Sequence, residues 1–340
     1  LSTTAMAVAA GPQLSDSDFA DLTFPYREWM SAGLMRPTGI TTENPFAGLV
    51  PEDVPRIRRR IPRVNRTPAF EPPATLSDRN FGVEIETGAT LNMRAAAQRL
   101  VEMGLDVEAQ DYNHSVRTYW KIVPDGSVSG GFEVVSPILT GREGRRELRR
   151  MMSALREIGC TTNGSCGLHV HHDVRDLTGQ EFYNLVLLWR DNQNLIDGLV
   201  SRSRREGRSQ WCRNVDNNTI NSARRLFEAC PGPIVSHRDF ERTLSVDRYQ
   251  TLNLASFPRQ GTVEVRQHQG TLNATKALAW VQLGQGMIQL AKDVTDENPA
   301  PTAATIRDLL GNLESAGMDS TAAAYLSDRA DAFAGGTATA

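Results

Sequence analysis

Four short stretches of this chain alternate apolar side chains with charged or imidazole side chains, which is the pattern of a β-strand whose two faces differ. The stretches are Phe81-Gly-Val-Glu-Ile-Glu86, Gly131-Phe-Glu-Val-Val-Ser136, Gly167-Leu-His-Val-His-His172 and Thr262-Val-Glu-Val-Arg266. One such strand is common on a protein surface. Four of them predict a sheet with one apolar face and one polar face, and the polar face gathers carboxylate, imidazole and guanidinium groups as an active site does.

Helical patterns lie between these strands. Apolar residues recur at three- and four-residue steps over residues 143–158, in a long segment from Thr178 through Leu199, and over residues 276–292. A hairpin is expected where Pro124-Asp-Gly-Ser127 supplies turn residues. Because the strands are joined by hairpins or by helical excursions, the sequence predicts an α+β fold. Its sheet is mainly antiparallel, with helices on one face and the polar active-site face open.

Composition divides the chain into three predicted regions. Residues 1–77 are rich in proline, which excludes long helices and central strands, and we expect an N-terminal extension there. Residues 78–292 carry the strand and helix patterns and form the predicted catalytic domain. Residues 293–340 hold two Ala-rich helical stretches, and we expect a disordered tail after them.

Bulk properties exclude several classes of protein. The formal net charge of −3 gives no overall attraction to nucleic acid, and we interpret the Arg-rich run over residues 56–66 as solvated. No apolar run approaches the roughly 20 residues that span a bilayer. The four cysteines show neither zinc nor disulfide spacing, which favours a reducing, cytoplasmic compartment. Neither nucleic acid nor membrane is therefore an expected partner, and the oligomeric state is not predicted.

The polar face is predicted to be a metal site. Glu84, Glu86, Glu133 and Glu264 would repel one another strongly on one sheet face unless cations bind among them. Hard divalent ions such as Mg²⁺ or Mn²⁺ prefer carboxylate oxygens together with water and substrate phosphates. The sequence therefore favours a metal-bound nucleotide over a structural zinc.

Basic side chains near these carboxylates support that interpretation. Arg266, Arg248 and Arg259 can hold phosphate oxygens and neutralise charge during phosphoryl transfer. The chain contains no Gly-x-x-x-x-Gly-Lys-Ser/Thr loop, which excludes a P-loop nucleotide site. Each motif alone also fits an ordinary solvated strand or an ion pair. The functional hypothesis depends on their joint occurrence on predicted strands.

Five motifs in this order resemble the amidoligase family, which are carboxylate–amine ligases with a glutamine-synthetase-like fold. They are Gly82-x-Glu84-x-Glu86, Trp120-Lys-Ile-Val-Pro-Asp-Gly-Ser127, Glu133-Val-Val-Ser-Pro137, Gly167-Leu-His-Val-His171 and Glu264-Val-Arg-Gln-His-Gln-Gly-Thr271. The intervening Arg248-Tyr-Gln-Thr-Leu-Asn253 resembles the family's Arg and Asn-Leu segment. The resemblance covers about residues 80–290 and leaves both flanks uncovered.

The resemblance implies ATP-dependent formation of an amide bond, peptide or isopeptide, through an acyl phosphate on a curved sheet. ATP and Mg²⁺ (or Mn²⁺) are the implied cofactors. The substrates would be a carboxylate and an amine from small molecules, peptides or proteins, and the sequence does not decide among them.

Site roles follow from the same resemblance. The implied metal ligands are Glu84, Glu86, Glu133, His169 and Glu264. The implied nucleotide contacts are His169, His171, Lys121, Asn253 and Arg266, with Lys121, Asp125 and Ser127 on a hairpin that overhangs the site. The catalytic residues would be Glu84, Glu264, Arg266 and Arg248, with Arg248 contacting either the transferring phosphoryl group or an acidic substrate.

Two other functions remain open at this point. His169-Val-His-His-Asp173 loosely resembles the ligand motif of zinc hydrolases, with His237 and His268 as possible further ligands, and such an enzyme needs no ATP. A catalytically inactive ligase fold that serves as a binding module is the non-enzymatic alternative. Against the inactive module, every expected acidic and basic position is occupied.

Overall fold

The fold is described for residues 73–128, 130–230, 232 and 246–335 of a computed structural model. Most of the predicted N-terminal extension, the predicted disordered tail and His237 lie outside these residues. The predicted boundaries of the three regions stay predictions.

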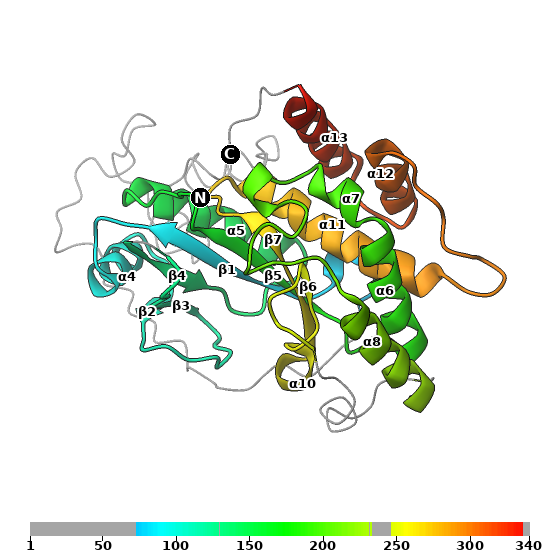
Figure 1. Cartoon of the computed structure of the whole chain (residues 1–340). Coiled ribbons are helices and arrows are strands. Elements are labelled where there is room, and N and C mark those ends of the chain that lie inside the picture. Colours follow the sequence, from blue (N-terminus) through cyan, green and yellow to red (C-terminus); the bar gives the residue numbers. More distant parts are fainter. Residues whose placement is uncertain (1–72, 129, 231, 233–245, 336–340) are drawn as a thin grey trace, which may run out of the picture.

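A seven-stranded sheet forms the centre of the fold, in the order β2-β3-β4-β1-β5-β7-β6 (Figure 1). Its strands are β1 (Phe81–Gly88), β2 (Val107–Ala109), β3 (Trp120–Val123), β4 (Gly131–Val135), β5 (Gly167–Asp173), β6 (Leu252–Asn253) and β7 (Thr262–Gln269). Every neighbouring pair is antiparallel except β2 with β3. The prediction of a mainly antiparallel sheet combined with helices is confirmed.

Helices pack against the sheet and lie in many of the connections between its strands. The longer ones are α4 (Met93–Glu102), α5 (Gly141–Glu157), α6 (Gly179–Asp191), α8 (Asn217–Ala229), α11 (Ala274–Asp293), α12 (Ile306–Ser315) and α13 (Ser320–Ala334). The short ones are η1 (Leu76–Asp78), α7 (Gln193–Asp197), η2 (Arg202–Arg204) and α10 (Phe257–Gln260). Within the described ranges, none of these helices combines the length and the apolar character that a bilayer crossing requires.

The two faces of the sheet differ as the alternating pattern predicts. Val83 and Ile85 of β1 and Leu168 and Val170 of β5 are fully buried and belong to one continuous hydrophobic core. Helices α5 and α11 lie across this apolar face (Figure 1). Burial of these side chains contributes about 1.5–3 kcal/mol each, so the core fixes which face of each strand is left for the polar groups.

The predicted helix from Thr178 through Leu199 is two helices, and this expectation was wrong. Helix α6 begins at a capping box in which Thr178 and Glu181 exchange hydrogen bonds, as its N-terminus predicts. It ends at Asn192, whose side-chain amide donates to the Leu188 carbonyl at 2.9 Å. An asparagine that satisfies a backbone carbonyl in this way competes with helix propagation, and α7 follows as a separate helix from Gln193.

The C-terminal helices complete the apolar layer. Leu309 and Leu313 of α12 and Leu326 of α13 are buried within the main core, and both helices pack on α11 (Figure 1). Helix α11 also covers His172, which faces away from the other two histidines of β5. A Cβ atom at Gly284 would overlap the His172 ring, so glycine at this position allows the close approach of helix and strand.

Candidate active site

Strand pairing places the predicted site residues in one row across the sheet. Glu133 of β4 pairs with Glu86 of β1, and Glu84 pairs with His169 of β5. The row continues through three paired positions on β5, β7 and β6, namely His171, Glu264 and Asn253. Directly paired residues share a face, so strands that are distant in sequence bring their polar groups together.

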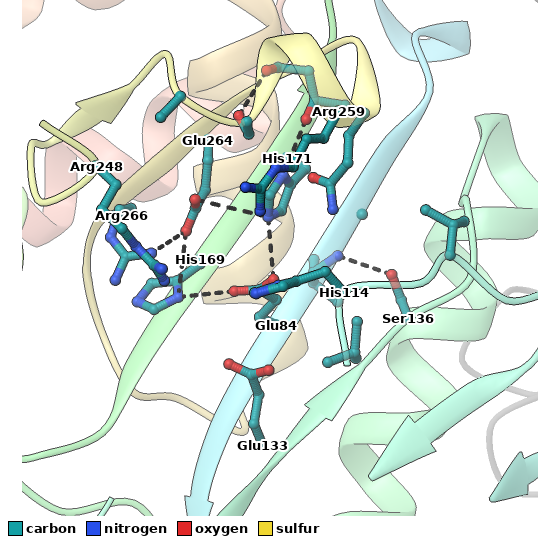
Figure 2. A pocket seen from close by; sticks show the side chains of 18 of the residues that line it. Glu84, His114, Glu133, Ser136, His169, His171, Arg248, Arg259, Glu264 and Arg266 are labelled. Carbon is teal, nitrogen blue, oxygen red and sulfur yellow. Dashed lines mark hydrogen bonds and ion pairs between the residues drawn. The ribbon is translucent and has the colours of Figure 1, made fainter. Parts of the chain in front are cut away.

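This row lies in a pocket of about 1010 Å³ on the open face of the sheet. One wall is the loop over residues 112–116 with the hairpin turn at 124–127, and the other is the segment over residues 246–262. Figure 2 shows Glu84, His169, His171 and Glu264 directed toward one another on neighbouring strands. The volume is at the upper end of small-molecule sites, which leaves room for more than one substrate.

Glu84 occupies the centre of the row between two imidazoles. Its Oε2 lies 3.1 Å from Nδ1 of His169, and its Oε1 lies 3.3 Å from Nε2 of His171. Burial alone would raise the pKa of Glu84, but the hydrogen bonds from His169 and His171 outweigh burial and hold the pKa well below its usual value. Burial alone would lower the pKa of His171, but the nearby carboxylates of Glu264 and Glu84 outweigh burial and raise the pKa. Glu84 is therefore an ionised carboxylate at the floor of the pocket.

Glu264 is held at both carboxylate oxygens. Nη1 of Arg266 donates to Oε1 at 2.5 Å, and Nδ2 of Asn253 donates to Oε2 at 2.7 Å. Nε of Arg266 also donates to the Trp211 carbonyl at 3.3 Å. The guanidinium group is thus anchored by two of its nitrogens, and charge at this end of the row is balanced within the protein.

Glu86 has a structural contact as well as a place in the row. Its Oε2 accepts a 2.6 Å hydrogen bond from the backbone N–H of Gly167, and its Oε1 lies 3.5 Å from Nε2 of His169. This bond ties β1 to the start of β5. Glu86 therefore helps to position His169 and His171 of β5.

Glu133 is the carboxylate of the row whose negative charge no described side chain balances. No hydrogen bond or ion pair joins its side chain to any other described residue, and Figure 2 shows it apart from the contacts around Glu264. Burial and then the charges of Glu84, Asp125 and Glu86 raise its pKa well above the usual value. A carboxyl group that the fold places beside three others, with no partner, is suited to a ligand that carries positive charge.

The donor set fits a hard divalent cation. Oxygen and nitrogen atoms of Glu84, Glu133 and His169 approach within 4.8 Å of one another, and so do those of Glu86, Asp125 and Glu133. A third group joins Glu84, His171 and Glu264. Carboxylate-rich sites with few nitrogen donors are those that Mg²⁺ and Mn²⁺ prefer. The sequence had not identified Asp125 as a ligand candidate, although it lies in the predicted hairpin turn.

A β-bulge decides which residues of β7 reach the pocket. Leu168 of β5 pairs with His268, but Val170 pairs with Val265, so β7 carries one extra residue between these points. Arg266 stays on the polar face, whereas His268 turns to the helical side, 5.0 Å from the ring of Trp280. This placement removes His268 from the ligand set that a zinc hydrolase would need.

Lys121 lies in the pocket wall but its ammonium group is already occupied. Nζ donates to the Asn113 carbonyl at 2.7 Å, to Oδ1 of Asn113 at 3.1 Å and to the Ser115 carbonyl at 3.0 Å. Burial lowers the pKa of Lys121, and the charges of Glu133 and Glu84 act against that effect. Lys121 therefore fastens the 112–116 loop over the pocket, a contact that no sequence motif indicated.

Arginine and aromatic side chains form the opposite rim. The guanidinium of Arg248 lies 5.2 Å from the ring centroid of Tyr249, and Tyr249 meets Trp211 edge to face. Arg259 and Arg175 also line the pocket, and Figure 2 shows Arg248 and Arg259 on either side of Glu264. Sequence reasoning identified Arg248 and Arg259 but missed Trp211, Tyr249 and Arg175, because rim residues on loops carry no periodic signal.

Comparisons with known proteins agree with the motif content. The family described as "Putative amidoligase enzyme" matches residues 77–288, which is more than half of the chain. A search of curated protein sequences found no match to this chain. A crystal structure of the complex between the prokaryotic ubiquitin-like protein Pup and its ligase PafA aligns with 12% identity and a TM-score of 0.34. That alignment covers 77% of this chain and 65% of the other, and at this TM-score it supports neither a shared activity nor a shared partner. On the family match, the chain belongs to the amidoligase enzyme family.

Proposed function

We propose that this amidoligase is an ATP-dependent carboxylate–amine ligase of glutamine-synthetase-like fold that uses Mg²⁺ or Mn²⁺ and an acyl phosphate. The observation that carries the proposal is the uncompensated carboxylate of Glu133 at one end of a row whose other end is neutralised by Arg266. Such a row has a place for a cation at one end and a fixed guanidinium for a phosphoryl group at the other.

The proposed reaction has two steps. A carboxylate oxygen of the acid substrate attacks the γ-phosphorus of ATP, and the bond to the bridging oxygen breaks and releases ADP. The amine nitrogen then attacks the acyl carbon, phosphate leaves with the bonding electron pair, and the nitrogen loses one proton to solvent. Both steps require that the reactants are aligned and that their charge is neutralised. The carboxylates and the guanidinium groups of this pocket are suited to both tasks.

The ion would be held by Glu84, Glu86, Glu133, His169 and Glu264, with Asp125 close to Glu133. A bound Mg²⁺ or Mn²⁺ would supply positive charge to the ATP phosphates. Glu84, kept ionised by its two imidazoles, stays ready to bind that ion near neutral pH. Arg266 needs little reorganisation to meet the transferring phosphoryl group, because two of its nitrogens are already anchored.

The remaining predicted nucleotide contacts take more specific roles in this proposal. Asn253 orients Glu264, and Lys121 holds the 112–116 loop, so both act on the nucleotide through the groups that they position. His171 bridges Glu84 and Thr262. Whether any of these side chains also touches ATP stays a prediction.

The acid substrate is proposed to enter along the arginine rim. Arg248 and Arg259 are exposed at the pocket edge and form no ion pair with a described carboxylate. Exposed guanidinium groups without a carboxylate partner favour a substrate that carries a second carboxylate in addition to the one that reacts. An amino acid or an acidic peptide side chain satisfies this requirement.

The test is a screen of carboxylate and amine pairs for release of ADP and phosphate by the purified chain. The proposal expects phosphate release only when ATP, divalent metal, acid and amine are all present. A hit is then repeated with ¹⁸O in the acid carboxylate, which the acyl phosphate route transfers to the released phosphate. Amide formation without ¹⁸O in phosphate would contradict the acyl phosphate, and amide hydrolysis without ATP would contradict the ligase.

A further inference from the structure

A second concentration of positive charge lies outside the pocket, where α11 and α13 pack together (Figure 1) and the 199–205 segment contacts α13. Lys276 stands in the first turn of α11 and Arg329 in α13. The guanidinium groups of Arg329 and Arg205 both stack on the Phe333 ring, 4.5 and 4.8 Å from its centroid. None of these residues lines the candidate active site.

No negative charge of the described chain offsets this cluster. Neither Lys276, Arg205 nor Arg329 forms an ion pair with a carboxylate in the ranges that the structure covers. Burial and the nearby charge of Arg329 lower the pKa of Lys276 to about 8. Like charges brought together without a counter-charge destabilise a fold, so the arrangement calls for an anion.

Buried donors without an acceptor lie in the same part of the fold. Arg329 donates from Nε to the Leu199 carbonyl at 2.8 Å, but its buried Nη2 has no acceptor. Trp280, one turn after Lys276 on α11, is 1% exposed, and its indole N–H has no acceptor either. The side chain of Gln269 accepts from the Ser201 N–H at 3.0 Å and leaves its own Nε2 unpaired.

These donors belong to one neighbourhood. The Trp280 ring lies 5.0 Å from His268, whose pKa is lowered first by burial and then by the charges of Arg329 and Lys276. Buried donors that lack acceptors are rare in folded proteins and cost about 1–3 kcal/mol each. Together with three cations that lack a carboxylate partner, they give this junction an excess of hydrogen-bond donors over acceptors.

The start of α11 adds to the attraction. Asn273 caps the helix by accepting from the Lys276 N–H at 3.1 Å. The helix that follows is 20 residues long, and the partial positive charge at its N-terminus favours an anion in front of its first turn. The helix dipole, the charged side chains and the hydrogen-bond donors without an acceptor thus all favour a negatively charged ligand.

We propose that the junction of α11, α13 and the 199–205 segment binds a small oxyanion of the phosphate class, held by Lys276 and Arg329. The site is separate from the pocket and does not depend on the proposed reaction. Free phosphate and the phosphate group of a small monoester offer the same chemistry to these groups.

The test is the melting temperature of the full chain titrated with inorganic phosphate at constant ionic strength set by sodium chloride. The wild type should show a saturable rise of about 3 °C, and Lys276→Gln and Arg329→Gln should lose most of it. Arg307→Gln is the matched control, because Arg307 lies on the neighbouring helix α12 in an exposed pair with Asp331. Glycerol phosphate in place of phosphate tells whether a monoester also fits.

Two further comparisons make the result decisive. Arg266→Gln, which alters the pocket, should keep the phosphate response, and loss of the response in that variant alone would overturn the proposal. In phosphate-free buffer Lys276→Gln should melt no lower than the wild type, because it removes a charge that repels Arg329. An equal phosphate response in the wild type and Lys276→Gln would also overturn the proposal, even if Arg329→Gln fails to fold.

Discussion

Two ends of one row of carboxylates behave in opposite ways. Glu264 is buried, and its charge is balanced by Arg266 at 2.5 Å and by the amide of Asn253 at 2.7 Å. Glu133, on the same face of the same sheet, has acidic neighbours and no partner among the described side chains. The fold therefore supplies a fixed cation at one end, and the other end needs a cation from outside. On the proposed function, we therefore expect phosphoryl contact at the first end and metal binding at the second.

The largest effect is expected at the balanced end. Glu264→Ala should reduce ATP turnover to background, because it removes a metal-capable oxygen and releases Arg266 from its anchor. Turnover would be measured as ADP formation, with circular dichroism to verify the fold. Glu143→Ala, which removes an exposed carboxylate on helix α5, is the control. Unchanged turnover in Glu264→Ala would remove Glu264 from the site.

Stability tests the balance itself. Arg266→Met leaves the buried carboxylate of Glu264 without its guanidinium and should lower the free energy of unfolding by about 3–5 kcal/mol in urea. Arg146→Met is the matched variant, because Arg146 pairs with Glu143 on the exposed face of α5 and should cost less than about 1 kcal/mol. Equal losses in the two variants would show that the Glu264–Arg266 pair is not special.

Metal should act on the unbalanced end. Addition of Mg²⁺ or Mn²⁺ at about 100 times its dissociation constant should stabilise the wild type by about 2.7 kcal/mol. Glu133→Gln should lose most of this gain, since it removes the one carboxylate that has no other partner. Thermal melts with and without EDTA measure both. A full metal response in Glu133→Gln would place the ion elsewhere.

The arginine rim should affect binding and leave the chemistry unchanged. Arg248→Gln is expected to raise the KM for the acid substrate about tenfold with kcat nearly unchanged, a loss of about 1.4 kcal/mol in binding. Arg259→Gln tests the second exposed arginine in the same way. A fall in kcat at constant KM would instead assign Arg248 to the phosphoryl group.

The smallest effect has the opposite sign. In EDTA at neutral pH, Glu133→Gln should stabilise the protein slightly, because the folded state disfavours a charged Glu133. A pKa raised by folding lowers stability as pH rises through the unfolded and then the folded pKa. The gain should therefore shrink as the pH falls toward the usual carboxyl pKa. Destabilisation by Glu133→Gln in EDTA would mean that its charge already has a partner.

The sequence allowed the two faces of each strand to be predicted. Side chains alternate between the faces with a period of two, so the residues on the polar face follow once the core residues are known. Glu84 with Glu86, and His169 with His171, share the polar face, and His172 lies on the other, as the alternation indicates. Family motifs then located the same residues independently. The helix start at Thr178 was equally predictable from its capping side chain.

Long-range geometry was beyond the same reasoning. The bulge that turns His268 to the helical side depends on pairing with β5, and no local pattern in β7 indicates an extra residue. The bond from Gly167 to Glu86 and the three bonds of Lys121 to the 112–116 loop join residues whose proximity only the fold creates. The balance at Glu264 and its absence at Glu133 likewise follow from register, which the residue types alone do not contain.

Calorimetric titration of ATP into the purified chain tests the central claim most directly, with Mg²⁺ or with EDTA, for the wild type, Glu133→Gln and the control Glu143→Gln. The account predicts binding that requires the metal and is at least about tenfold weaker in Glu133→Gln than in the other two proteins. ATP binding of equal strength in EDTA, or in Glu133→Gln with Mg²⁺, would contradict a metal-bound nucleotide at this row of carboxylates.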